Sequence, residues 1–196
     1  MRIASSPRKT LGSWGRVSGS ARTRVSVIEH VPVRAHRARP LAASAARAGS
    51  GPKTATILTD RGAGKRVAMI GHFPFSERLE PTCGELWIFE RGAGRSGGDL
   101  GGEMMEELLP QADVVGVTST TIINRTLPGI LDLVRPDAFV LLLGPSTPLT
   151  PGLFDHGIDL LCGTVIVDAA AVRRAVEQGA VTSQIKGVRR LCLWPE

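Results

Sequence analysis

The sequence predicts an α/β domain with a doubly wound, mostly parallel sheet, preceded by a basic leader. From Lys65 onward, short apolar runs alternate with segments of helical spacing, and the apolar runs are continuous rather than interrupted by polar residues. Continuous runs are typical of strands covered on both faces, and the alternation of strand and helix gives βαβ units with parallel strands. We therefore expect a leader over 1–64 and one α/β domain over 65–196.

The leader differs from the domain in charge. Residues 1–66 carry fourteen basic and two acidic side chains, whereas 67–196 carry ten basic and sixteen acidic ones. The periodic apolar stretch over 25–33 is compatible with one strand, and the rest has too little apolar surface to offset the entropy of ordering, which predicts disorder. A transit peptide and a nucleic-acid-binding arm are the alternatives. Because aromatic residues are nearly absent among the charges, nucleic acid is not an expected partner despite the basic leader.

The elements of the domain follow in order. Six apolar runs are predicted strands, at 66–70, 86–89, 112–117, 138–143, 158–161 and 188–193. Three segments with helical spacing lie between them, at 102–109, 127–134 and 168–178, and Asp168 and Gly179 suit the two ends of the last helix. No apolar run approaches the roughly 18 to 20 residues that a membrane span requires, so no membrane contact is expected.

The three cysteines, Cys83, Cys162 and Cys192, lie far apart and form no C-x-x-C pair. This pattern predicts reduced, buried thiols in a cytoplasmic protein rather than a disulfide framework or a zinc site. For Cys162, a nucleophile or a soft-metal ligand is the alternative.

Candidate ligand-binding residues follow the predicted strands. The carboxyl ends of parallel strands meet at one edge of a sheet, and ligands bind there near the point where the strand order reverses. The candidates at this edge are Gly71, His72, Phe73, Phe75, Glu90, Thr118, Asn124, Gly144, Ser146 and Thr147.

The loop after the first strand is not a dinucleotide-binding loop, because it lacks G-x-G-x-x-G and its two phenylalanines are too bulky for close approach of a pyrophosphate. Phe73 and Phe75 suit the wall of a site for a flat organic ligand, or core positions. His72 is a ligand or metal contact, or an ordinary hydrogen-bonded residue. Glu90 follows Gly71 at about the 20-residue spacing of a ribose-binding acid, with an ion pair to Arg91 as the alternative.

Hydroxyl groups follow the third and fourth strands. Thr118 and Asn124 are expected to face a ligand, whereas Thr126, shortly before Pro128, suits a helix N-cap. The turn over 144–148 offers hydroxyl and backbone N–H groups to an anion or carboxylate. Motifs of zinc proteases, serine hydrolases or P-loop nucleotidases are absent from the sequence.

Five of these segments, 67–75, 90–91, 118–126, 143–149 and 154–163, resemble the Rossmann-like "putative heavy-metal chelation" domain. The resemblance extends over about 67–193, and Gly-Pro-Ser-Thr-Pro at 144–148 is its most specific element. It implies a metal or metal chelate as the bound group. It also implies a preceding small domain that is similar to the amino-terminal domain of enolase, with a site between the two, and the basic leader does not resemble that domain.

The leading hypothesis is a domain that binds or transforms a small organic or metal-chelating ligand at the strand ends. Glu90, Asn124 and the Ser146–Thr147 pair would orient the ligand, with the two phenylalanines packed on it. A nucleotide-cofactor enzyme that uses S-adenosylmethionine or NAD, with Glu90 on the ribose, is the rival, and the missing glycine motif counts against NAD. A non-catalytic scaffold is the third hypothesis. The sequence assigns no catalytic residue, no metal ligand and no oligomeric state.

Overall fold

The computed structural model describes residues 47–49, 54–90, 99–181 and 183–195. The strands are β1 (Arg47–Gly49), β2 (Arg66–Ile70), β3 (Glu85–Phe89), β4 (Val114–Thr118), β5 (Phe139–Leu143), β6 (Leu160–Ile166) and β7 (Val188–Trp194). The α-helices are α1 (Thr54–Gly62), α2 (Met105–Leu108), α3 (Thr120–Ile123), α4 (Leu127–Leu133) and α5 (Ala169–Glu177). Short 3₁₀ turns are η1 (Ser76–Arg78), η3 (Gly102–Met104), η4 (Leu109–Gln111) and η5 (Pro151–His156).

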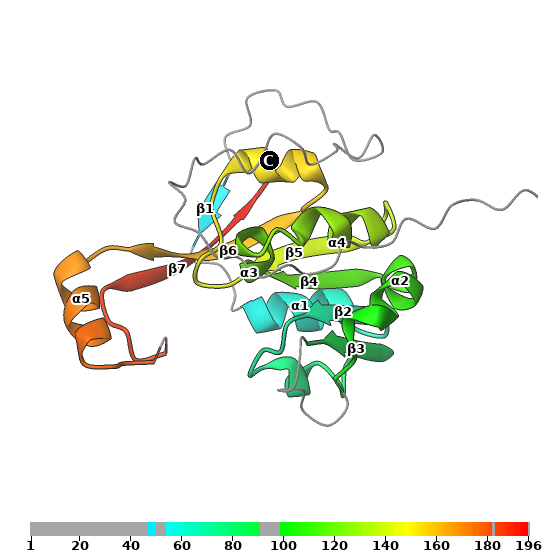
Figure 1. The fold of residues 1–196 in the computed structure, drawn as a ribbon, viewed down its shortest axis with the longest axis horizontal. Helices are drawn as coiled ribbons and strands as arrows, with labels where there is room; N and C mark the ends of the chain where they lie inside the picture. The colour runs from blue at the N-terminus through cyan, green and yellow to red at the C-terminus, as the bar shows by residue number, and fades with distance from the viewer. Residues whose placement is uncertain (1–46, 50–53, 91–98, 182, 196) are drawn as a thin grey trace, which may run out of the picture.

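The strands form one sheet in the order β1-β7-β6-β5-β4-β2-β3 (Figure 1). Strands β2 to β6 are parallel to one another, and β7 is antiparallel to both β6 and β1. The chain moves outward from β2 to β3 and then returns past β2 to β4, so the strand order reverses between β2 and β4. This confirms the doubly wound, mostly parallel sheet and places its topological switch point at β2 and β4.

Two apolar layers cover the sheet. Alternate residues of β2 enter different layers, with Ala68 and Ile70 in one and Val67 and Met69 in the other. Residues of α2 and α4 pack on the first layer, and Leu58 of α1 is wholly buried in the second. Burial on both faces explains why the strands are continuous apolar runs.

All six predicted strands are present, and structured segments occupy the three predicted helical regions. The difference lies before Lys65, where the sequence predicts only leader. The helix α1 begins at Thr54, and Leu58 packs into the core, so the domain includes residues on the leader side of the expected boundary. The helix contains three threonines and few apolar residues, so apolar periodicity in the sequence does not indicate it. The strand expected over 25–33 lies outside the described residues.

The cysteine expectation is wrong for one pair. Cys162 and Cys192 form a disulfide, with their Cα atoms 4.2 Å apart. They lie directly opposite each other in the antiparallel β6–β7 pair, so their separation of 30 residues along the chain did not indicate their distance in space. Cys83 is a free thiol, as expected. Since disulfides are rare in reducing compartments, the cysteines no longer support the cytoplasmic location.

The pair β6–β7 extends past the sheet as a two-stranded arm that carries α5 at its far end (Figure 1). β6 pairs with β5 only as far as Cys162, and beyond that point its partner is β7. Asp168 caps α5 as predicted, because its carboxylate accepts a hydrogen bond of 2.9 Å from the backbone N–H of Ala171. Within the described ranges, no helix has the length and apolar character needed to cross a bilayer.

Candidate functional site

The loops that follow β2 and β4 meet at the switch point. Gly71, the first residue after β2, has a φ of +101°, and a Cβ atom there would lie 3.2 Å from Cβ and Cγ2 of Thr118 at the end of β4. Glycine is therefore favoured by the backbone angle and by the close approach of the two loops. This close approach holds the ends of β2 and β4 together at the candidate site.

The end of β3 holds the β2 loop through Glu90. The Oε2 atom of Glu90 accepts a 2.8 Å hydrogen bond from the backbone N–H of His72. The ring Nδ1 of His72 lies 3.1 Å from Oδ2 of Asp99. The predicted residues His72 and Glu90 are thus neighbours, and the structure adds Asp99 to them.

Asp99 was not a candidate from the sequence. A parallel bridge joins the next residue, Leu100, to Phe89 at the end of β3. The backbone N–H of Leu100 also donates to the carbonyl of Ile88 at 2.7 Å. Asp99 lies at the strand-end edge because of this pairing. The local sequence, with two glycines before Asp99 and one apolar residue after it, is too weak a signal to predict the pairing.

The loops after β4 and β5 are also joined. The hydroxyl oxygens of Ser119 and Ser146 are 2.9 Å apart, and the backbone N–H of Ser119 donates to the carbonyl of Leu143 at 2.8 Å. Gly144 has a φ of +139°, and a Cβ atom there would lie 2.5 Å from the Ser119 hydroxyl oxygen. Ser119, a second residue that sequence reasoning missed, is therefore the contact that couples the two loops.

Other predicted residues occupy less open positions. Thr147 is only 5% exposed, and its hydroxyl has no hydrogen-bond partner among the described residues. The side-chain oxygen of Asn124 accepts hydrogen bonds from the backbone N–H and the hydroxyl of Thr126 at 3.2 and 2.7 Å. Phe73 and Phe75 stack with ring centroids 5.4 Å apart and pack against the second core layer. The hydroxyl of Thr126 makes no helix-capping bond.

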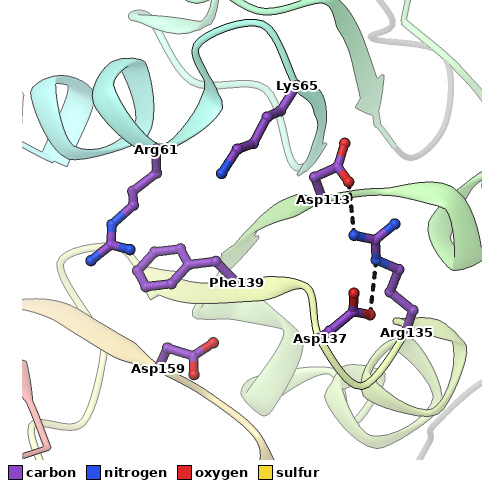
Figure 2. Close-up of a pocket in the computed structure, with 7 residues that line it drawn as sticks. All are labelled: Arg61, Lys65, Asp113, Arg135, Asp137, Phe139 and Asp159. Atoms are coloured by element: carbon purple, nitrogen blue, oxygen red, sulfur yellow. Dashed lines mark ion pairs between the residues drawn. The ribbon is translucent and has the colours of Figure 1, made fainter.

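A shallow pocket of about 360 Å³ lies at the opposite edge of the sheet, where the parallel strands begin (Figure 2). Its lining residues are Arg61, Lys65, Asp113, Arg135, Asp137, Phe139 and Asp159. Charged groups here pair with one another. Asp113 lies 2.8 Å from Nη2 of Arg135, and Nε of Arg135 lies 3.0 Å from Oδ1 of Asp137.

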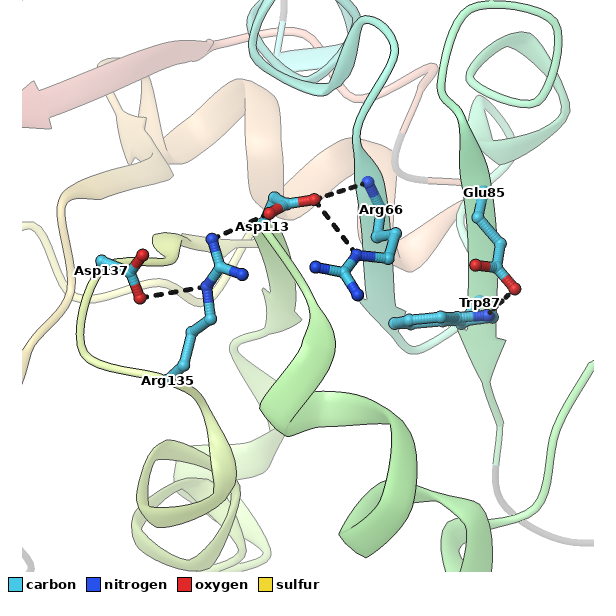
Figure 3. Close-up of polar contacts among 6 residues, drawn as sticks. All are labelled: Arg66, Glu85, Trp87, Asp113, Arg135 and Asp137. Atoms are coloured by element: carbon cyan, nitrogen blue, oxygen red, sulfur yellow. Dashed lines mark hydrogen bonds and ion pairs between the residues drawn. The ribbon is translucent and has the colours of Figure 1, made fainter.

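The carboxylates of this edge cap the starts of strands. Asp113 accepts a hydrogen bond of 2.9 Å from the backbone N–H of Arg66 at the start of β2 (Figure 3). Asp159 accepts one of 2.7 Å from the backbone N–H of Val140 in β5. The Arg66 N–H, followed by the guanidinium of Arg135, lowers the pKa of Asp113, although burial acts in the opposite direction. These contacts describe a structural network, so we place the candidate site at the carboxyl edge.

Fold and site together define a doubly wound α/β domain of the class in which ligands bind at the switch point. Within this class, the chain belongs to the family described as "Putative heavy-metal chelation", whose model matches residues 54–194. An uncharacterised protein of Methanocaldococcus jannaschii is 29% identical over 123 residues, which is 61% of this chain and 48% of that protein. The chain thus spans about half the length of this relative.

Two crystal structures of family proteins of unknown function are similar in fold. The one from Desulfitobacterium hafniense has a TM-score of 0.62 and 32% identity, and the match covers 73% of this chain and 58% of that one. The one from Pyrococcus horikoshii has a TM-score of 0.65 and 22% identity, with 76% and 60% covered.

Proposed function

We propose that the domain binds a small organic or metal-chelating ligand at the carboxyl edge of the sheet, against the loops after β2 and β4. One observation carries the proposal. Loops from four strand ends meet at one edge, through the close approach of Gly71 to Thr118 and the hydrogen bonds of His72 with Glu90 and of Ser119 with Ser146. Sites of this kind use a few convergent polar groups to orient a ligand at the switch point.

A chelated metal suits these residues better than a bare ion. No group of three or more His, Cys, Asp or Glu side chains that could hold a metal occurs within the described parts of the chain. A metal that is already held by an organic chelator needs fewer protein ligands. The family description supports this class of ligand, and the ligand would be held mainly through its organic part.

The nucleotide alternative depends on Glu90 as a ribose-binding acid. The bond from the His72 N–H already engages Oε2 of Glu90 in holding the loop after β2. That loop contains two stacked phenylalanines in place of a glycine-rich turn. These features favour the organic ligand over NAD or S-adenosylmethionine, which remain the alternative.

A thermal-shift screen with metal ions, chelators, metal chelates and nucleotides in separate wells tests the proposal. We expect stabilisation by a chelator or metal chelate. The Glu90→Gln substitution weakens the bond from the His72 N–H that holds the loop after β2, and it should then weaken ligand binding by about 1.5–3 kcal/mol, the range for hydrogen bonds to charged groups. Asp137→Asn, on the opposite edge, is the matched control and should leave affinity unchanged. A shift by nucleotides alone would support the cofactor alternative, and no shift in any well would support the scaffold.

A further inference from the structure

The pair His72–Asp99 at the carboxyl edge joins a buried carboxylate to a partly exposed imidazole ring. The side chain of Asp99 is 4% exposed, whereas that of His72 is 34% exposed. Both carboxylate oxygens lie near the same ring nitrogen, at 3.1 and 3.3 Å from Nδ1. The carboxylate is therefore shielded from water, whereas the imidazole ring is partly exposed to water.

The backbone fixes both members of the pair. Asp99 precedes Leu100, whose N–H and carbonyl are hydrogen-bonded to β3 and to the backbone N–H of Glu90. His72 is held by its own N–H, which donates to the Glu90 carboxylate. The short distance between ring and carboxylate is thus a consequence of strand pairing, with both residues attached to the end of β3.

The chemistry of the ring follows from this contact. A carboxylate accepts hydrogen bonds, so a neutral His72 donates from Nδ1 and keeps its lone pair on Nε2, at the other side of the ring. A histidine oriented by a carboxylate in this way is the arrangement of a general base.

We propose that His72 is a proton acceptor for a hydroxyl group of the bound ligand, and that Asp99 is its positioning residue. This rests on the proposed ligand site. In the step, the ligand O–H bond breaks, its electron pair stays on the oxygen, and the proton moves to Nε2 of His72. This step requires a ligand with an ionisable hydroxyl group. The oxyanion of the ligand then forms next to the imidazolium of His72.

The reactivity of the Nε2 lone pair can be tested with a reactive ester, without knowing the natural ligand. With p-nitrophenyl acetate, Nε2 accepts a proton from the water molecule that attacks the carbonyl carbon, p-nitrophenolate leaves with the electron pair of the broken C–O bond, and acetic acid is the other product. We expect His72→Gln to slow p-nitrophenolate release by about tenfold or more, since a positioned imidazole contributes roughly 10²- to 10⁴-fold in enzymes. Asp99→Asn should also slow it. His156→Gln is the matched control and should react like the unsubstituted protein.

Two outcomes overturn the proposal. One is a His72→Gln or Asp99→Asn protein that melts normally and reacts at the unsubstituted rate. The other is a ¹⁵N NMR spectrum in which the neutral ring of His72 carries its proton on Nε2 instead of Nδ1, a measurement on the unsubstituted chain that does not depend on how the variants fold. Because neither experiment needs a bound ligand, failure of the ligand screen and failure of this inference are distinguishable.

Discussion

The two edges of the sheet contain polar residues in similar positions, directly before or after parallel strands, but these residues are held in different ways. At the amino edge, Asp113 and Arg135 bind each other and the backbone of neighbouring strands. At the carboxyl edge, hydroxyl groups, two glycines and the His72–Asp99 pair join loops, and the Cys162–Cys192 disulfide lies beneath the Gly144 turn. Ion pairs secure the first edge, whereas a covalent bond and close backbone packing secure the second.

The difference has a physical origin. The start of a parallel strand presents backbone N–H groups, and a carboxylate just before the neighbouring strand can accept their hydrogen bonds, as Asp113 does for Arg66 and Asp159 for Val140. After such a strand ends, the chain turns into a loop, and glycines with positive φ shape two of these loops, at Gly71 and Gly144. The comparison teaches that a charged pocket is not by itself the better candidate for function, because its charges can already be satisfied.

The largest expected effect concerns the disulfide. Replacing Cys162 and Cys192 together by alanine should lower the free energy of unfolding by about 3–4 kcal/mol, from the loop-closure entropy of a bridge that spans 30 residues. Denaturant unfolding measures this loss, and reductant should bring the unsubstituted protein to the same value. Cys83→Ala is the control, since its thiol is free and its loss should not abolish the response to reductant. An unsubstituted protein that is insensitive to reductant would contradict this account of the carboxyl edge.

The same contrast explains what the sequence predicts and what it does not. Strands such as β4 and β5 are apolar runs buried on both faces, so their local composition indicates their structure. The Gly71, Glu90 and Thr118 positions follow from parallel topology, which brings strand ends together. Asp99, Ser119 and the disulfide depend on pairing between distant segments. The helix α1 packs on the core through Leu58. Pairing between distant segments and packing of a single side chain both leave no recognisable pattern in the local sequence.

An intermediate effect is expected at the amino edge. Asp113→Asn removes a charge that accepts from the Arg66 N–H and faces Arg135, and it should cost about 2 kcal/mol at neutral pH, within the range for hydrogen bonds to charged groups. The pKa of Asp113 is lowered in the folded state, so its contribution is present above the ordinary aspartate range near pH 4 and is lost as the pH falls through the lowered pKa.

The measurement is denaturant unfolding of both proteins at several pH values. The difference between Asp113→Asn and the unsubstituted chain should shrink as the pH falls below about 4, where the unfolded chain binds a proton at Asp113, and should vanish below the lowered pKa of the folded state. The loss from the disulfide variant should stay constant over the same range. A constant Asp113 difference in acid would show that the carboxylate charge is not what secures the amino edge.

The smallest expected effect lies only a few ångströms from the Asp113 pair. Asp137 is 74% exposed and lies 3.0 Å from Nε of Arg135, whose Nη2 contacts the less exposed Asp113 at 2.8 Å. Exposed ion pairs contribute little, since water and salt screen them and ordering two long side chains costs entropy. Asp137→Asn should therefore change the free energy of unfolding by at most about 0.5 kcal/mol, and less in high salt. If its loss equalled that of Asp113→Asn, the shared arginine rather than the capped strand would organise this edge, because only the arginine contacts both carboxylates.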